Sequence, residues 1–159
     1  VSMSLLKVKE YLKKYNLEER IMEFPVTSAT VKDAALALKC SEEEIVKTLS
    51  FMVDDKPILI AVAGDYKIDN SKFKAEFHTK AKMIPSTLVE NLIGHAVGGV
   101  CPFGVKEDVD IYLDISLKKL KTVYPAAGTS NSAVKLTLEE LEKVSNYKKW
   151  VDVCKKIGE

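Results

Sequence analysis

The residues that could do chemistry gather in one glycine-rich stretch, Ala96-Val97-Gly98-Gly99-Val100-Cys101-Pro102-Phe103-Gly104. Gly98 and Gly99 let the backbone turn and let another molecule approach its N–H groups, and Pro102 fixes the exit of the loop. A loop of this kind can present amide donors to an oxyanion or a phosphate. A tight turn between two buried segments accounts for the same residues, and from composition alone it is the simpler interpretation.

Cys101 is the most reactive side chain of this loop. A cysteine nucleophile needs a thiolate, usually beside a histidine, and His95 precedes Cys101 by six positions, with His78 further away. A small residue next to a proline in a turn is more often structural, so a Cys/His hydrolase is the minor interpretation. Cys40, Cys101 and Cys154 form no CxxC or Cys/His cluster, so neither a zinc site nor a disulfide framework is indicated.

Lys47 is the most informative charge, because it lies in the apolar segment Val46-Lys47-Thr48-Leu49-Ser50-Phe51-Met52-Val53. In a strand, Lys47 shares a face with Leu49 and Phe51, while Val46, Thr48 and Ser50 face the other way. A lysine on an apolar face either reaches to the sheet edge or is held for function, and the sequence leaves both open. As a functional group it is a point charge suited to a phosphate or a carboxylate.

The elements that must position these residues are short and irregularly ordered. Apolar spacing and N-cap residues predict helices at 4–15, 30–38, 70–77, 87–92 and 137–144, and a short one after Ser41. Strands are predicted at 20–24, 46–53, 58–63, 82–84, 109–113, 121–124, 133–136 and 150–153. Residues 46–63 read as a hairpin, which fits a mixed α/β (α+β) sheet and not a regular βαβ series.

Length and composition limit the classes of protein. The 159 residues predict a single domain, 1–159, with the N-terminal helix at about 4–15 as an appendage. The net charge of +1 argues against a strongly basic binder of long nucleic acid and leaves room for a local contact with a short RNA end. No apolar run reaches the length of a membrane span, and scattered cysteines favour a reducing cytoplasm. No Walker A, GxGxxG or HExxH sequence is present.

Three stretches taken in order carry a resemblance: Val46-Lys47-Thr48-Leu49, then Gly98–Gly104, then Thr122–Gly128 followed by a strand and Thr137-Leu138-Glu139-Glu140-Leu141. Together they resemble the YbaK/EbsC family, which is related to the editing domain of bacterial prolyl-tRNA synthetase. The resemblance runs from about Phe24 to Val153. It implies a distorted, barrel-like mixed β-sheet surrounded by helices. It also implies an aminoacyl-tRNA deacylase that hydrolyses mischarged tRNA, without metal or cofactor.

The resemblance also implies a set of site residues. The strand lysine of the family falls on Lys47, and its G-x-x-x-P loop falls on Gly98 through Pro102. The residues implied as catalytic are Lys47, Gly98, Gly99, Val100 and Cys101, and those implied as substrate-binding are Pro102, Ala127, Gly128, Asn131 and Ser132. Implied partners are the 3′ end of an aminoacyl-tRNA, of the tRNA-Pro type with a small amino acid, and an aminoacyl-tRNA synthetase as a further candidate.

Two departures from the family pattern affect the expected function. Many relatives have serine before the proline, where this chain has Cys101. Relatives also tend to carry a basic residue in the turn before the late strand, whereas Gly128-Thr129-Ser130-Asn131-Ser132 has none. The second departure keeps an alternative open, namely a non-catalytic module of the same fold that binds tRNA ends or nucleotides.

Overall fold

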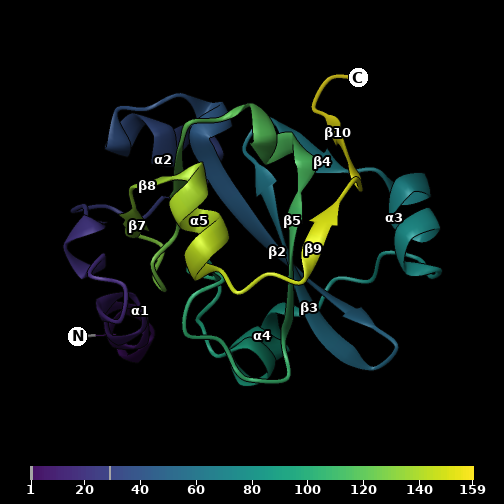
Figure 1. Cartoon of the computed structure of the whole chain (residues 1–159), viewed down its shortest axis with the longest axis horizontal. Helices are drawn as coiled ribbons and strands as arrows, with labels where there is room; N and C mark the ends of the chain where they lie inside the picture. The colour runs from purple at the N-terminus through teal and green to yellow at the C-terminus, as the bar shows by residue number, and fades with distance from the viewer. Residues whose placement is uncertain (1, 29) are drawn as a thin grey trace.

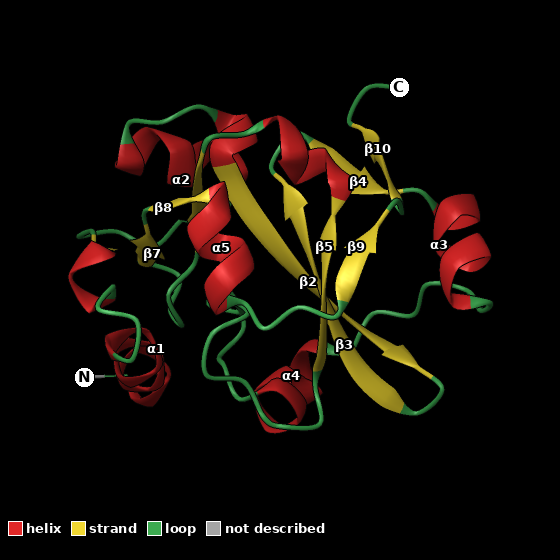
Figure 2. Cartoon of the chain, viewed as in Figure 1, coloured by secondary structure: helices red, strands yellow, loops and turns green. Residues whose placement is uncertain are grey.

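A computed structural model describes residues 2–28 and 30–159 (Figure 1). Its centre is a six-stranded mixed sheet, ordered β8-β6-β2-β3-β5-β9, that curls into a half-barrel with helices around it (Figure 2). The hairpin predicted at 46–63 is present as β2 (Ile45–Val53) and β3 (Lys56–Ala63), paired antiparallel. Its two-residue turn, Asp54-Asp55, has positive φ at both positions, which matches the right-handed twist of the strands. Every residue of β3 after Lys56 is buried, as its continuous apolar run predicts.

The remaining strands extend the sheet on both sides and add two small ladders. β5 (Asp110–Asp114) runs parallel to β3, and β9 (Lys149–Val151) runs parallel to β5. On the other side β6 (Thr122–Pro125) runs parallel to β2 and pairs antiparallel with β8 (Leu136–Thr137). The two ladders join β1 (Ile21–Glu23) to β7 (Ser132–Val134) and β4 (Tyr66–Ile68) to β10 (Cys154–Lys156).

Three of the helices begin at side-chain caps that the sequence signals. The helices are α1 (Met3–Lys13), α2 (Val31–Leu38), α3 (Asn70–Phe77), α4 (Ser86–Ile93) and α5 (Leu138–Val144), with 3-10 turns η1 (Glu18–Arg20), η2 (Glu42–Glu44) and η3 (Ile115–Lys119). Thr30, Asp69 and Thr137 each accept a hydrogen bond from the backbone N–H three residues later, as expected of N-caps. The helix predicted at 87–92 is α4, which begins at Ser86 after Pro85 and has no side-chain cap.

Helix α1 is part of the packed domain. Leu5, Val8 and Leu12 are buried in the same core cluster as Cys101 and Phe103. The structure therefore corrects the expectation of an appendage: the apolar face of this helix covers the back of the glycine-rich loop. Helix α3 lies at the opposite end of the molecule, next to β4 and β10 (Figure 1), and packs Phe73 against Phe51 of β2.

Two strand predictions differ from the structure, and two of its strands have no counterpart among the predictions. The segment 82–84 forms only an isolated bridge, Phe51↔Met83, and the segment 133–136 is divided into β7 and β8 at Lys135. Strands β4 and β10 were not predicted, because their three-residue sequences contain charged residues that mask any alternation. Neither 2–28 nor 30–159 contains a helix with the length and apolar character that crossing a membrane requires.

Candidate active site

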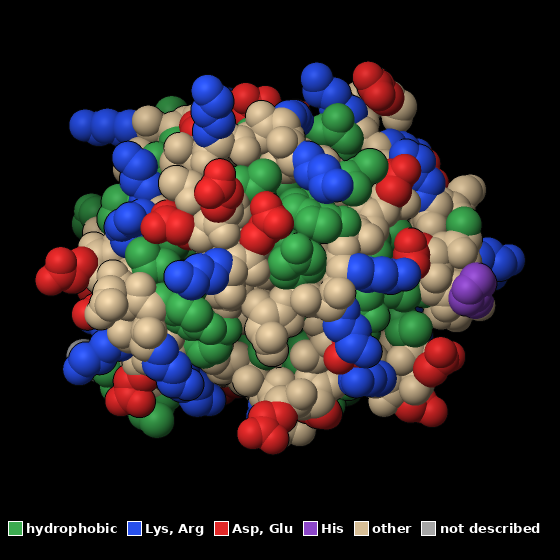
Figure 3. Space-filling model, viewed as in Figure 1, with side chains coloured by type: hydrophobic (Ala, Val, Ile, Leu, Met, Phe, Trp, Pro, Cys, Tyr) green, Lys and Arg blue, Asp and Glu red, His purple; other side chains and the backbone are tan. Residues whose placement is uncertain are grey.

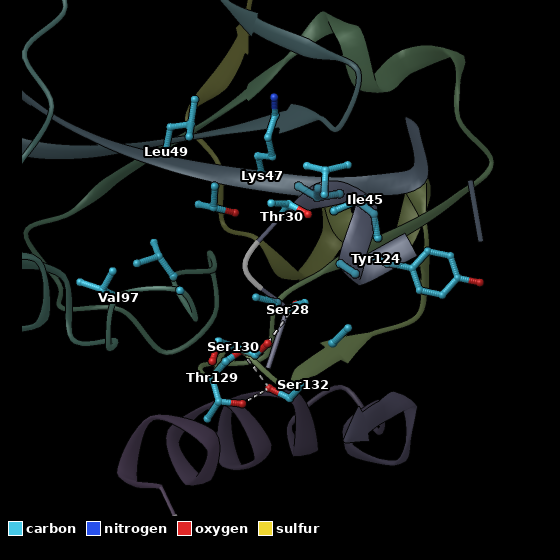
Figure 4. A pocket seen from close by; sticks show the side chains of 18 of the residues that line it. Ser28, Thr30, Ile45, Lys47, Leu49, Val97, Tyr124, Thr129, Ser130 and Ser132 are labelled. Carbon is cyan, nitrogen blue, oxygen red and sulfur yellow. Dashed lines mark hydrogen bonds between the residues drawn. The ribbon is translucent and has the colours of Figure 1, made fainter. Parts of the chain in front are cut away.

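A cavity of about 550 Å³ opens between strand β2, helix α2, the start of α4 and the loops 97–100 and 126–133 (Figure 4). Besides apolar side chains, its lining is rich in hydroxyl groups, which belong to Ser28, Thr30, Thr48, Ser50, Ser86, Thr129, Ser130 and Ser132. Among the described lining residues the only ionisable side chains are those of Lys47 and Tyr124. The cavity therefore offers hydrogen bonds but no carboxylate, imidazole or thiol to act as a base or nucleophile.

The two small-residue loops pack directly on each other at one wall of this cavity. A Cβ atom on Gly99 would lie 2.2 Å from the carbonyl carbon of Gly128, a distance that no real side chain tolerates. Gly98 has φ +90° and Gly128 has φ +94°, in the left-handed region that favours glycine. The glycines thus allow the two backbones to touch, and this close packing fixes the loop 97–100 against the loop 126–133.

Three residues of the glycine-rich loop, Val97, Gly98 and Val100, line the cavity and have backbone N–H groups without an acceptor in the described ranges. The N–H of Gly99 donates to the carbonyl of Ala96 at 3.0 Å and so closes the turn. Within residues 2–28 and 30–159, the N–H groups of Gly98 and Val100 donate to no acceptor. Both residues line the cavity, and unpaired amides at a concave surface are the donors that an oxyanion needs.

The facing loop is tied to the segment that follows β1. Both the backbone N–H and the hydroxyl of Ser28 donate to the carbonyl of Ser130 at 2.9 Å (Figure 4). Asn131 Nδ2 donates to the carbonyl of Phe24 at 3.1 Å, and the hydroxyls of Thr129 and Ser132 lie 2.5 Å apart. These bonds hold the polar wall in place, and they use Asn131 as a structural link and not as a lining residue.

Lys47 lies on the strand that lines the cavity, but its ammonium group points the other way. In Figure 4 the Lys47 and Leu49 side chains extend from β2 on the side opposite Ser28 and Ser130. The ammonium is half-buried and donates to the carbonyl of Tyr66 in β4. Burial lowers the pKa of Lys47, while nearby Cys154 and Asp65 oppose that shift. A contact between this ammonium and a phosphate in the cavity therefore requires it to leave Tyr66.

Cys101 and His95 form a pair, but the pair is inside the core. Cys101 Sγ lies 3.6 Å from His95 Nε2, and both residues are completely buried. Burial raises the pKa of Cys101 to about 12, and burial lowers the pKa of His95, whose Nε2 lies 2.6 Å from the carbonyl of Phe103. A neutral histidine next to a protonated thiol is a packing contact, so the implied catalytic role of Cys101 is not supported by its position.

The sequence profile of the aminoacyl-tRNA editing domain family matches residues 26–144. The chain belongs to this family. It is 47% identical over 154 residues to the uncharacterized protein YwhH of Bacillus subtilis (strain 168), covering 96% of this chain and 98% of YwhH. It is also 27% identical over 100 residues to the proline–tRNA ligase of the same organism, which is 62% of this chain and only 18% of the ligase.

The fold of the editing domain is confirmed by a solved structure. A crystal structure proposed as that of a trans-editing enzyme for prolyl tRNA synthetase superimposes with a TM-score of 0.87 at 27% identity, covering 98% of this chain and 99% of that one. The resemblance to the YbaK/EbsC family and the barrel-like mixed sheet expected from it are therefore confirmed. The substrate class of the editing domain family is aminoacyl-tRNA.

Not all ten residues implied by the resemblance meet in the cavity. Those that line it are Lys47, Gly98, Val100 and Ser132. The others lie outside the lining: Gly99 and Gly128 pack the two loops together, Ala127 and Cys101 are in the core, Asn131 is a structural link, and Pro102 borders a second hollow next to α1.

Of the lining serine and threonine hydroxyls, only that of Ser132 was predicted as a site residue; the seven others are those of Ser28, Thr30, Thr48, Ser50, Ser86, Thr129 and Ser130. The alternation of β2 had placed Thr48 and Ser50 on one face. Only the curled sheet reveals that this face forms the floor of the editing-domain cavity.

Proposed function

We propose that this editing domain is a deacylase acting in trans, which hydrolyses the ester bond of a mischarged tRNA carrying a small amino acid. The observation that carries the proposal is the pair of unpaired amides, Gly98 and Val100, on the wall of a cavity lined by hydroxyl groups. The match of nearly full length to a relative proposed as a trans-editing enzyme supports action in trans. By the same analogy, a tRNA of the proline type is the first candidate substrate, and the cytoplasm is its setting.

The mechanism must work without a protein base, because the lining residues include no carboxylate, histidine or cysteine in the described part of the chain. A water molecule attacks the ester carbonyl carbon, and the free hydroxyl of the terminal ribose positions it. The developing oxyanion accepts hydrogen bonds from the amides of Gly98 and Val100. The ester C–O bond then breaks, and the ribose oxygen takes up the proton. Catalysis in this scheme comes from positioning and from fixed backbone dipoles.

The expectation of a small amino acid rests on the family analogy. Ala126, Ala133 and Ser132 line the cavity beside the loop 129–130, so short side chains form the wall next to the polar loop. A pocket that admits small side chains and excludes larger ones is the general logic of editing sites. The basic residue that relatives carry in the turn 128–132 is absent here, so contact with the tRNA phosphates falls to residues outside this wall.

The direct test is a panel of mischarged tRNAs, beginning with Ala- and Cys-tRNA-Pro, in which loss of the ester is followed over time. Gly98→Ala should abolish most of the turnover, because its Cβ would lie 3.1 Å from Ser130 Cβ, next to the N–H groups of Gly98 and Val100. Gly158→Ala is the matched control, since Gly158 has nearly the same positive φ and nothing within 4 Å of its Cβ. Equal turnover in both variants would remove the loop from the mechanism.

The alternative function, a non-catalytic module that binds tRNA ends or nucleotides, has one observation in its favour. The ammonium of Lys47 is bound to Tyr66 on the far face of β2, so the cavity holds no charge that contacts a phosphate in this conformation. A protein that binds uncharged and mischarged tRNA equally, and leaves every ester of the panel intact, would establish this alternative.

A further inference from the structure

Strand β2 has a gap in its pairing where it borders the cavity. On the edge away from β3, β2 pairs with β6 only at Ile45 and Val46. Further along the same edge, Ile84 N donates to Ser50 O at 3.1 Å, and Met52 N donates to the carbonyl of Lys82 at 3.0 Å. No strand in the described ranges pairs with the stretch between these two contacts.

Thr48 is the residue whose backbone faces this gap. In an antiparallel pair, successive residues direct their N–H and C=O groups alternately toward the partner strand and away from it. Ser50 and Met52 use theirs on the edge away from β3, so Thr48 directs its own N–H and C=O to that edge too. Val46 pairs with Pro125 of β6 on that edge. Among Val46, Thr48, Ser50 and Met52, Thr48 is therefore the residue whose backbone has no partner on the edge away from β3.

The side chain of Thr48 is also unpartnered. Thr48 Oγ1 is buried and makes no hydrogen bond to any described residue. Its neighbour across the ladder is Ala61 in β3, which offers no polar side chain. Buried hydroxyl groups are normally paired, and an exception in a native fold calls for an explanation. A ligand group in the cavity supplies one, because Thr48 is part of the lining.

We propose that Thr48 binds the α-ammonium group of the aminoacyl ester through its carbonyl oxygen and Oγ1, an assignment that rests on the proposed function. An α-ammonium brings three N–H donors and a positive charge, and it needs acceptors once it leaves water. The lining offers no carboxylate among its described residues, and the Ser130 carbonyl already accepts two bonds from Ser28. The gap at Thr48 supplies acceptors on the cavity floor.

The proposal defines the ligand class as esters with a free α-amino group. N-acylation removes the charge and two of the three donors, and a hydroxy acid replaces the ammonium with a neutral hydroxyl. Both should bind poorly, because buried acceptors are left without their charged donor. The α-ammonium group is common to all unblocked aminoacyl esters. Thr48 therefore distinguishes these esters from peptidyl or N-blocked esters, and the size of the cavity distinguishes one aminoacyl group from another.

The test uses analogues that the protein cannot hydrolyse, so binding is measured whether or not the protein is an enzyme. The probes are 3′-amide-linked alanyl-adenosine, its N-acetyl derivative and the lactoyl amide, titrated calorimetrically. The wild-type protein should bind the alanyl amide at least about tenfold more tightly than either blocked probe. Thr48→Val should reduce that ratio about tenfold while its thermal stability stays equal or rises, since an unpaired hydroxyl becomes a methyl group. Thr122→Val, on β6 outside the lining, should change neither quantity.

Two results would overturn the assignment: equal or absent binding of the three probes, or a Thr48→Val protein that is less stable and keeps the full ratio. The second would make the hydroxyl a structural group. Failure of the proposed function looks different. Intact esters in the tRNA panel, together with a preserved preference for the free amine, would reject the deacylase and leave the ammonium site standing.

Discussion

Replacing Cys101 by alanine should leave ester hydrolysis almost unchanged, although Cys101 sits in the glycine-rich loop next to a histidine. Its thiol is completely buried, and burial raises its pKa to about 12. At a pH of about 7.5 such a thiol is almost entirely protonated, whereas about one in ten unperturbed cysteines is a thiolate. His95 does not help, because burial lowers its own pKa and keeps it neutral.

The expected cost of Cys101→Ala is in stability. Removing a buried sulfur from the main core cluster should lower the free energy of unfolding by about 1–2 kcal/mol, the range for small core truncations. Turnover of the folded protein should stay within about threefold of the wild type, since the unpaired amides of Gly98 and Val100 are unaffected. Cys154→Ala is the matched control, because Cys154 is also buried but belongs to the cluster on the other face of the sheet.

Two measurements decide the outcome: hydrolysis of mischarged tRNA at a temperature where both variants are folded, and the rate at which an alkylating reagent labels each cysteine. Cys40 is partly exposed and should react first, with Cys101 and Cys154 protected. A Cys101→Ala protein that is folded but inactive, next to an active Cys154→Ala protein, would refute the reasoning. Labelling of Cys101 as fast as Cys40 would refute it too, since the thiol would then be accessible.

Three further outcomes follow from the same geometry. Lys47→Met should lose about 1–3 kcal/mol of unfolding free energy in urea denaturation, because the carbonyl of Tyr66 loses a charged donor; a much larger loss of turnover in the folded variant would show that the ammonium leaves Tyr66 for the substrate. Gly99→Ala should destabilise far more than Gly158→Ala in thermal unfolding, because its Cβ would meet Gly128 at 2.2 Å; equal melting temperatures would contradict this packing. Burial lowers the pKa of His95 from 6.5, so His95 is protonated in the unfolded chain at a pH where it is still neutral in the native state. The free energy of unfolding should therefore fall as the pH drops below about 6.5. His95→Phe should flatten this pH dependence, and an unchanged slope would contradict the assignment to His95.

The sequence predicts best where the signal is local. The hairpin of β2 and β3 follows from one continuous apolar run and the turn signal of residues 54–57, and α3 begins where its Asp69 cap predicts. The alternation of β2 even separates Lys47 correctly from Thr48 and Ser50. What alternation cannot supply is which of the two faces borders a cavity, because both faces of this curled sheet carry buried side chains and pack against other elements.

The family motif was the second source of prediction, and it mixes two physical roles. Gly99 and Gly128 are needed so that two backbones can touch, whereas Gly98 and Val100 line the cavity and have N–H groups that donate to no described acceptor. The G-x-x-x-P pattern does not separate these roles, since glycine serves both. The direction in which Cys101 points is a tertiary outcome of packing against α1, so its type and spacing alone could not exclude a nucleophile.

The distribution of charge bears on how such a domain would hold a tRNA. Arg20 is the only arginine of the chain, and it is bound to both carboxylate oxygens of Glu140, at 2.9 and 3.1 Å. The face drawn in Figure 3 shows basic and acidic side chains intermingled, without a continuous basic patch. Because the net charge of the chain is only +1, we expect binding of the tRNA body to be weak and only modestly sensitive to salt, and recognition at the cavity to depend on hydrogen bonds and size. The synthetase expected as a further partner would compensate for weak binding if it held the tRNA while this domain received the 3′ end.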